Sequence, residues 1–170
     1  QNDADIQDLV TAVNAMFPGT VSTHAETITK YKSLVMGIGW FATMLGPTLR
    51  LTVSVLGRAM HAPSIKAFKA AKQVLRHIKG TIGTGITYHK TKDWDHDEYP
   101  QLEYGSDASL ADDPDTLKTQ GGYVARFPGQ AATTFVSRQS ATLCTSTYQA
   151  ETHFASEAVK DIYYKRALFN

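Results

Sequence analysis

The segment from Gln101 to Ser137, QLEYGSDASLADDPDTLKTQGGYVARFPGQAATTFVS, decides the fold class. Residues 101–108, 121–127 and 132–137 each have the composition of a strand, and Pro128-Gly129 turns the chain between the last two. A helical segment then runs from Ser146 to Phe169, with Ala150, Phe154, Ala158 and Ile162 along one face. Three antiparallel strands followed by a helix predict an α+β fold, in which a three-stranded sheet packs against that helix.

Helices are expected before this sheet. Residues 4–17, 28–45 and 48–60 show helical apolar spacing, and a fourth helix is predicted from the N-cap Ser64 to about residue 79, with Gly80 as its stop. Tyr31, Trp40 and Phe41 are interpreted as core residues, and residues 85–89 alternate like a strand. The sequence therefore predicts a helical segment over residues 1–80 and a sheet-containing domain over residues 81–170.

The composition excludes several classes of protein. The chain has 170 residues, 42% of them hydrophobic, which is enough for a domain with a core and a helical appendage. A single cysteine, Cys144, excludes an internal disulfide and a multi-cysteine zinc site. We expect no membrane span and no signal peptide, and therefore an intracellular protein of the cytoplasm or nucleus. Because the chain begins at Gln1 rather than Met, we expect a processed product or an excised piece of a polyprotein.

Charge is segregated along the chain. Residues 27–92 contain 11 Lys and Arg but no Asp or Glu, whereas residues 93–117 contain nine acids and no Lys or Arg. This pattern favours one surface for an anionic partner and another for cations. The alternative is a solvated basic helix beside a solvated acidic loop.

One face of the fourth predicted helix is basic. It carries Lys66, Lys69, Lys72, Arg76 and Lys79, at spacings that can follow the phosphates of a nucleic-acid strand. At the end of the third strand, Arg138 and Gln139 are further candidates for contacts with a nucleic-acid backbone. A plain surface role remains the alternative for all seven residues.

Two carboxylates far apart in the sequence are the candidate catalytic residues. Asp107 lies near the end of the first predicted strand of the sheet, and Glu151 lies in the first turns of the helix expected to cross it. Two converging carboxylates repel each other unless a cation neutralises them, and Mg²⁺ or Mn²⁺ prefers such oxygen ligands. In contrast, Asp112, Asp113 and Asp115 are interpreted as turn formers with a structural role.

At these residues the chain resembles a known family. YGSDASLADDPDTLKTQGGYV (residues 104–124) and STYQAE (residues 146–151) resemble the ribonuclease H domain of copia-type long-terminal-repeat retrotransposon polyproteins. The preceding residues 31–88 resemble the helical end of the reverse transcriptase of the same polyproteins. The resemblance implies that Asp107 and Glu151 are metal ligands, and that water attacks the phosphorus of the RNA strand in an RNA–DNA hybrid to leave a 3′-hydroxyl.

The chain departs from that family pattern at several positions. Ser109 and Leu110 stand where the family has an acid and a tryptophan, and Gln149 stands where it has another acid. The family also takes two further carboxylates from a later strand and helix, so the resemblance implies a domain truncated at its C-terminus. Glu157 and Asp161 do not share the helix face of Glu151 and are not expected to replace them.

Two functions from different classes remain open at this point. The first is a ribonuclease H-type nuclease, incomplete as this chain, and the second is a module derived from a retroelement that binds nucleic acid or protein without cutting. An exposed sheet edge is expected to favour self-association. His89 and His96, near Asp93, Asp95 and Asp97, suggest either a transition-metal site or a solvated loop.

Overall fold

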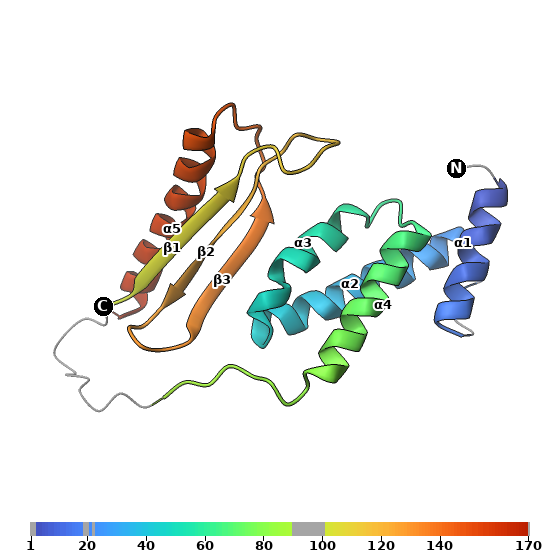
Figure 1. Ribbon diagram of the computed structural model, residues 1–170, viewed down its shortest axis with the longest axis horizontal. Coiled ribbons are helices and arrows are strands. Elements are labelled where there is room, and N and C mark those ends of the chain that lie inside the picture. The colour runs from blue at the N-terminus through green and yellow to red at the C-terminus, as the bar shows by residue number, and fades with distance from the viewer. Residues whose placement is uncertain (1–2, 19–20, 22, 90–100, 170) are drawn as a thin grey trace. The chain divides into compact units, whose positions relative to one another are not determined.

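The structure is a computed structural model that describes residues 3–18, 21, 23–89 and 101–169. The chain divides into two compact units, Gln1–Gly85 and Ile86–Asn170, and each is described here by itself. The first consists of helices, and the second contains a three-stranded antiparallel sheet and a helix. The predicted α+β fold class is therefore confirmed (Figure 1).

The helices of the first unit follow the predicted order. They are α1 (Asp3–Met16), α2 (His24–Met44), the 3₁₀ helix η1 (Pro47–Leu49), α3 (Arg50–Arg58) and α4 (Ile65–Gly80). The helix α2 begins four residues earlier than predicted because of a capping box. The Thr23 hydroxyl accepts a hydrogen bond from the Glu26 N–H, and the Glu26 carboxylate accepts one from the Thr23 N–H. The Ser64 cap on α4 is as predicted, since its hydroxyl accepts a hydrogen bond from the Ala67 N–H.

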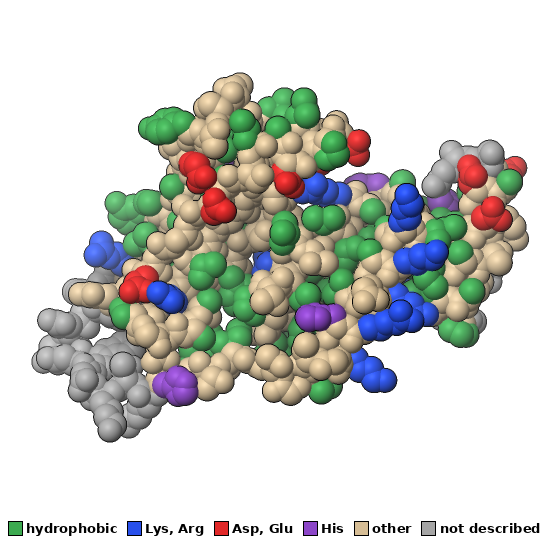
Figure 2. Space-filling view, in the orientation of Figure 1, with side chains coloured by type: hydrophobic (Ala, Val, Ile, Leu, Met, Phe, Trp, Pro, Cys, Tyr) green, Lys and Arg blue, Asp and Glu red, His purple; other side chains and the backbone are tan. Residues whose placement is uncertain are grey.

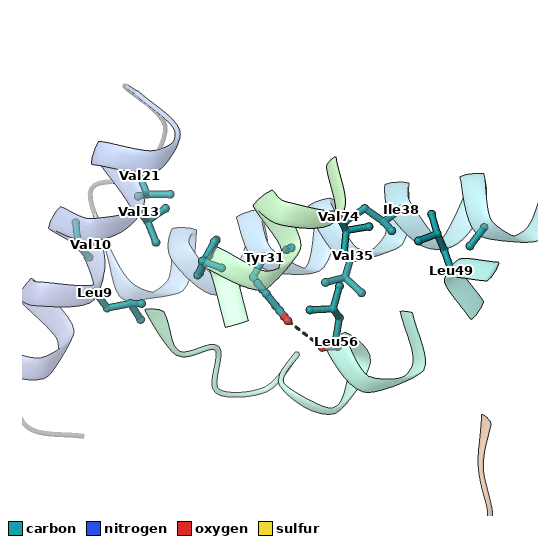
Figure 3. Packing of buried hydrophobic residues seen from close by; sticks show 13 residues of the cluster. Leu9, Val10, Val13, Val21, Tyr31, Val35, Ile38, Leu49, Leu56 and Val74 are labelled. Atoms are coloured by element: carbon teal, nitrogen blue, oxygen red, sulfur yellow. Dashed lines mark hydrogen bonds between the residues drawn. The ribbon is translucent and has the colours of Figure 1, made fainter. Parts of the chain in front are cut away.

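A single apolar cluster holds the helices of this unit together (Figure 3). Tyr31 is fully buried, and its hydroxyl donates a 2.9 Å hydrogen bond to the carbonyl of Leu56. Its ring meets the ring of Phe68 edge-on, with 5.0 Å between the centroids. The Tyr31 hydroxyl is therefore buried with its ring, and its hydrogen bond connects α2 to α3.

The core assignment of Trp40 was wrong. Trp40 is 63% exposed, and it lies with Met36 and Met44 on the side of α2 that faces away from the apolar cluster. Tyr31 is in the core as predicted, whereas Phe41 is half-buried. The reason is that α2 is apolar around most of its circumference, so that residue type alone does not distinguish its buried side.

The second unit contains β1 (Glu103–Ser109), β2 (Gln120–Arg126), β3 (Ala132–Gln139) and α5 (Thr147–Phe169). The strands pair in the order β1-β2-β3, both pairs being antiparallel, and α5 packs against β1 and β2 (Figure 1). The strand expected over residues 85–89 is absent from the described residues. Instead the Tyr88 hydroxyl donates to the carbonyl of Ala132, and the His89 N–H donates to the side chain of Gln130.

Two adjacent glycines make the close packing of the sheet and α5 achievable. A Cβ on Gly121 would lie 2.3 Å from the Phe154 ring, which is fully buried against β2. A Cβ on Gly122 would lie 2.0 Å from the carbonyl oxygen of Val136. Neither position has room for a side chain, so the helix contact depends on Gly121 and the strand contact on Gly122.

Among the described residues, no helix combines the length and the apolar character that a membrane crossing requires.

Candidate functional site

Asp107 occupies an exposed position on β1. In the strand register it lies opposite Gly122, which in turn lies opposite Ser137. The face of the sheet covered by α5 is marked by Tyr104, whose hydroxyl donates a 3.1 Å hydrogen bond to Asp161 of that helix. Because side chains alternate along a strand, Asp107 lies on the opposite face, beside a position that has no side chain. Its carboxylate is therefore open to solvent on an edge strand of the described sheet.

Glu151 lies beside the ridge of α5 that packs on the sheet, on the side opposite to Glu157. The ridge of α5 packed on the sheet contains Phe154, and Glu157 lies on one side of that ridge because it pairs with Arg138 of β3. Glu151 is six residues before Glu157, or about 120° away around the helix. It is therefore on the other side of the ridge from Glu157, and its side chain is half-buried.

Most described acids around the two predicted ligands are held by internal partners, and the carboxylate of the exposed Asp115 is an exception. Several acids of this unit are paired: Glu103 with Arg126, Glu157 with Arg138 and Lys160, and Asp161 with Lys165 and Tyr104. Within the described ranges, no hydrogen bond or ion pair is recorded for the carboxylate of Asp107 or Glu151. Carboxylates without internal partners retain all their oxygen lone pairs for a ligand.

Asp113 has the structural role predicted for it. It is 6% exposed, and its carboxylate accepts hydrogen bonds from the Thr116 hydroxyl, the Gln139 amide and the Asp115 N–H. The hydrogen bonds from Thr116 and Gln139 are the main reason that the pKa of Asp113 falls to about 2. Asp113 thus attaches the β1–β2 loop to the end of β3.

Gln139 and Arg138 are engaged within the protein rather than free on its surface. The Gln139 amide is the donor to Asp113, and the Arg138 guanidinium pairs with Glu157. Hydrogen bonding from Lys160, together with the charge of Arg138, lowers the pKa of Glu157. A contact with nucleic acid through either residue would have to compete with these internal partners.

The predicted basic face lies on α4, and one of its members is engaged elsewhere. Lys66, Lys69, Arg76 and Lys79 are exposed. Lys72 is half-buried, and its ammonium donates a 2.9 Å hydrogen bond to the carbonyl of Met16 at the end of α1.

The sequence also carried a signal for the start of α5. The Ser146 hydroxyl accepts a hydrogen bond from the Gln149 N–H, and the Gln149 side chain accepts from the N–H of Thr145 at 2.7 Å. This arrangement fixes the helix that bears Glu151, and the pattern Ser-x-x-Gln is visible in the sequence. Gln149, which replaces an acid of the resembled family, thus has a capping role here.

Metal ligands other than these two carboxylates were sought in the described part of the chain. That part contains no group of three or more His, Cys, Asp or Glu side chains that could hold a metal ion. The histidine and aspartate loop proposed as an alternative site, with Asp93, Asp95, His96 and Asp97, lies outside the described residues.

Comparison with known proteins gives three relatives. Over 155 residues, 90% of the chain, it is 29% identical to the retrovirus-related Pol polyprotein from transposon TNT 1-94 of Nicotiana tabacum. It is 30% identical over 88 residues to an uncharacterized mitochondrial protein of Arabidopsis thaliana, of which it covers 74%, and these residues are 52% of the chain. A second uncharacterized mitochondrial protein of Arabidopsis thaliana is 34% identical over 56 residues, which are 33% of the chain and 23% of that protein.

The matched region is a small part of the polyprotein. The chain spans 11% of the length of the tobacco polyprotein. No family model matches the chain. No solved structure matches it significantly.

Proposed function

Because this chain belongs to a family of retroelement-derived proteins related to the Pol polyproteins of retrotransposons, we propose that its second unit is a ribonuclease H-type nuclease. The substrate is the RNA strand of an RNA–DNA hybrid, and the cofactor is Mg²⁺ or Mn²⁺. The observation that carries the proposal is the contrast among the acids of this unit. Among the described residues, the carboxylates of Asp107 and Glu151, the two positions that the family motif assigns to metal, have no recorded partner. Glu103, Asp113, Glu157 and Asp161 are paired, and Asp115, which the motif does not assign to metal, is the other described acid of this unit whose carboxylate has none.

In the proposed site, a cation shared by these two acids would lie at the edge of β1, because Asp107 and α5 are on opposite faces of the sheet. Asp107 lies on the uncovered face of this edge strand, and Glu151 lies about 60° around α5 from Phe154, which packs on the covered face. Since no other described strand continues the sheet beyond β1, a cation at that edge is accessible from both sides. Two carboxylates supply part of the octahedral oxygen shell that Mg²⁺ requires, and water or further ligands supply the remainder.

In this proposal the residues of the chain would hold and orient the divalent cation, and the cation would stabilise the negative charge that develops on the scissile phosphate. A bound divalent cation lowers the pKa of a coordinated water and stabilises the leaving oxygen. The Asp107 carboxylate fixes the cation relative to the sheet, and the Glu151 carboxylate fixes it relative to α5. Gln149 and Ser146 hold the first turn of α5 and thereby the position of Glu151.

The test is cleavage of a labelled RNA–DNA hybrid with Mg²⁺, with Mn²⁺ and with chelator. We expect wild-type cleavage of the RNA strand that leaves a 3′-hydroxyl, and losses of at least about 100-fold for Asp107→Asn and for Glu151→Gln. The control is Asp115→Asn, which changes an exposed acid in the neighbouring loop. Direct Mn²⁺ binding, followed by electron paramagnetic resonance, should weaken in the same two variants. Equal cleavage and equal Mn²⁺ binding by all four proteins would overturn the proposal.

The second candidate function is binding without cleavage. It is favoured by the absence, within the described residues, of a third carboxylate grouped with the first two. In that case hybrid binding should weaken steeply with salt, and no turnover should follow the addition of metal.

A further inference from the structure

We propose that the solvent-exposed side of α4 is a binding surface for the sugar-phosphate backbone of a nucleic acid. This surface, called here the α4 basic face, consists of Lys66, Lys69, Gln73, Arg76 and Lys79. It belongs to the first unit, and it operates whether or not the second unit cleaves. Figure 2 shows Lys and Arg side chains gathered over the region of α4.

The geometry of α4 separates this face from the core. Phe68, Ala71 and Val74 are buried in the apolar cluster of the unit. At about 100° per residue, Lys66, Lys69, Gln73 and Arg76 share an arc of about 80° on the opposite side, and Lys79 lies about 60° beyond Arg76. Lys66, Lys69 and Arg76 therefore line one exposed strip, with the neutral hydrogen-bonding amide of Gln73 between them. Lys79 is exposed in the last turn, beside the end of that strip.

The α4 basic face does not include Lys72, which the sequence had placed among its five cations. The Lys72 ammonium donates to the Met16 carbonyl and also lies 5.6 Å from the centroid of the Phe17 ring. It therefore satisfies the C-terminal end of α1 and packs on an aromatic side chain. Its role is structural, and it is not a member of the binding surface.

The four exposed cations of α4 have no recorded counterion within the part of the chain that the structure describes. For Lys66, Lys69, Arg76 and Lys79, no hydrogen bond or ion pair of the side chain is recorded with any described residue. In the second unit, by contrast, four of the six described Lys and Arg side chains pair with a carboxylate, namely Arg126, Arg138, Lys160 and Lys165. The sequence explains the difference, because residues 27–92 contain no Asp or Glu.

The location of Lys66 also indicates an external anion. It lies in the first turn of α4, where the partial positive charge of the helix dipole disfavours a cation, and that turn contains no acid. A helix selected only for stability and solubility would carry Asp or Glu at this end. An anionic partner compensates for this unfavourable placement.

The spacing fits a nucleic-acid backbone rather than a membrane. Lys66 and Arg76 are about 15 Å apart along the helix axis, and a duplex strand carries one phosphate per about 3.4 Å of its axis, so that several phosphates lie within reach. A helix that binds a lipid surface inserts its apolar side, whereas the apolar side of α4 is already packed in the core. No large apolar side chain of α4 is exposed.

The test is the salt dependence of binding by a protein that cannot cleave. The full chain with Asp107→Asn and Glu151→Gln is titrated with a fluorescent RNA–DNA hybrid at several KCl concentrations. We expect the logarithm of the association constant to fall with the logarithm of salt with a slope of about −3 to −4. The further changes Lys69→Gln and Arg76→Gln should reduce the magnitude of this slope by about 2, since each phosphate contact contributes about 0.9.

The matched control is Lys160→Gln, which removes an exposed cation that is paired with Glu157, and should leave the slope unchanged. Circular dichroism establishes that each variant is folded. An unchanged slope in the Lys69→Gln, Arg76→Gln variant would overturn the proposal. Tighter binding to phosphatidylserine vesicles than to the hybrid, lost in the same variant, would also overturn it in favour of a lipid partner. Because both titrations use cleavage-deficient protein, neither outcome depends on whether the nuclease proposal holds.

Discussion

Gln139, the last residue of β3, donates a 2.6 Å hydrogen bond from its side-chain amide to the carboxylate of Asp113 in the β1–β2 loop. This bond connects positions 26 residues apart and joins the loop that follows Asp107 to the strand that leads into α5. The loop also contains two non-glycine residues with positive φ, Ala111 at 52° and Leu117 at 54°. Backbone angles of this kind cost free energy, and Leu117 is held in place by a 2.7 Å hydrogen bond from its N–H to the carbonyl of Asp113.

Asp113→Asn should remove a pH-dependent part of the stability. The folded pKa of about 2 lies below the ordinary value of 3.8, so ionised Asp113 stabilises the fold at pH values above about 4. This contribution is lost as the pH falls from about 4 towards 2. Urea unfolding at pH 7 and at pH 2.5 should show the variant to be the less stable protein at pH 7, and the difference should shrink at pH 2.5. For Asp115→Asn, in the same loop, the difference in stability from the wild type should be the same at pH 7 and at pH 2.5.

Gly121→Ala should destabilise the second unit by about 1 to 3 kcal/mol or more, because the added methyl overlaps the Phe154 ring. The loss should be smaller in a Phe154→Leu background, since the smaller side chain leaves space for the methyl. Gly122→Ala is the control, because its methyl meets the backbone of Val136, which Phe154→Leu does not alter. Equal costs of Gly121→Ala in both backgrounds, measured by urea unfolding, would contradict this explanation.

Tyr31→Phe should cost about 0.5 to 1.5 kcal/mol, because it removes a buried 2.9 Å hydrogen bond, while the Leu56 carbonyl keeps its 3.2 Å bond from the Ala59 N–H. Tyr88→Phe removes a comparable hydroxyl donor to the carbonyl of Ala132, but at an exposed site where water replaces it. Its expected cost is below about 0.5 kcal/mol. Thermal unfolding of both variants checks the difference, and similar losses would contradict it.

Trp40→Ala should change the free energy of unfolding by no more than about 0.5 kcal/mol, because most of the Trp40 side chain is in solvent. Phe68→Ala should cost about 3 to 5 kcal/mol, because its ring is fully buried among four helices. Urea unfolding distinguishes the two. A loss of several kcal/mol from Trp40→Ala would place that ring in the core after all.

Helices and strands whose apolar residues recur at a regular spacing were predictable from the sequence. The apolar stripe of α4 and its Ser64 cap gave that helix within one residue, and the alternating strands with Pro128-Gly129 gave the hairpin of β2 and β3. The strand expected over residues 85–89 failed because alternation is a property of any extended segment. Only hydrogen-bonding partners distinguish a strand from such a segment, and these partners are side chains elsewhere in the fold.

The candidate site was predictable in residue type but not in pairing. The sequence singled out Asp107 and Glu151, and it assigned Asp113 to the turn from its local composition. It gave no sign that Arg138 pairs with Glu157 or that Lys72 binds the end of α1, because these contacts join residues 19 and 56 positions apart. Long-range pairing determines which charges remain available to a ligand, and one-dimensional spacing does not encode it.

The close contact of Phe154 with Gly121 has a consequence for Glu151, which precedes it by three residues on the same helix. The ring lies directly over the Gly121 backbone, so this contact sets how α5 lies on β2 at that point. The location of the Glu151 carboxylate is therefore dictated by a missing side chain on a different strand. A single methyl group at residue 121 would turn the helix and displace that carboxylate, although every acidic residue of the protein stayed the same.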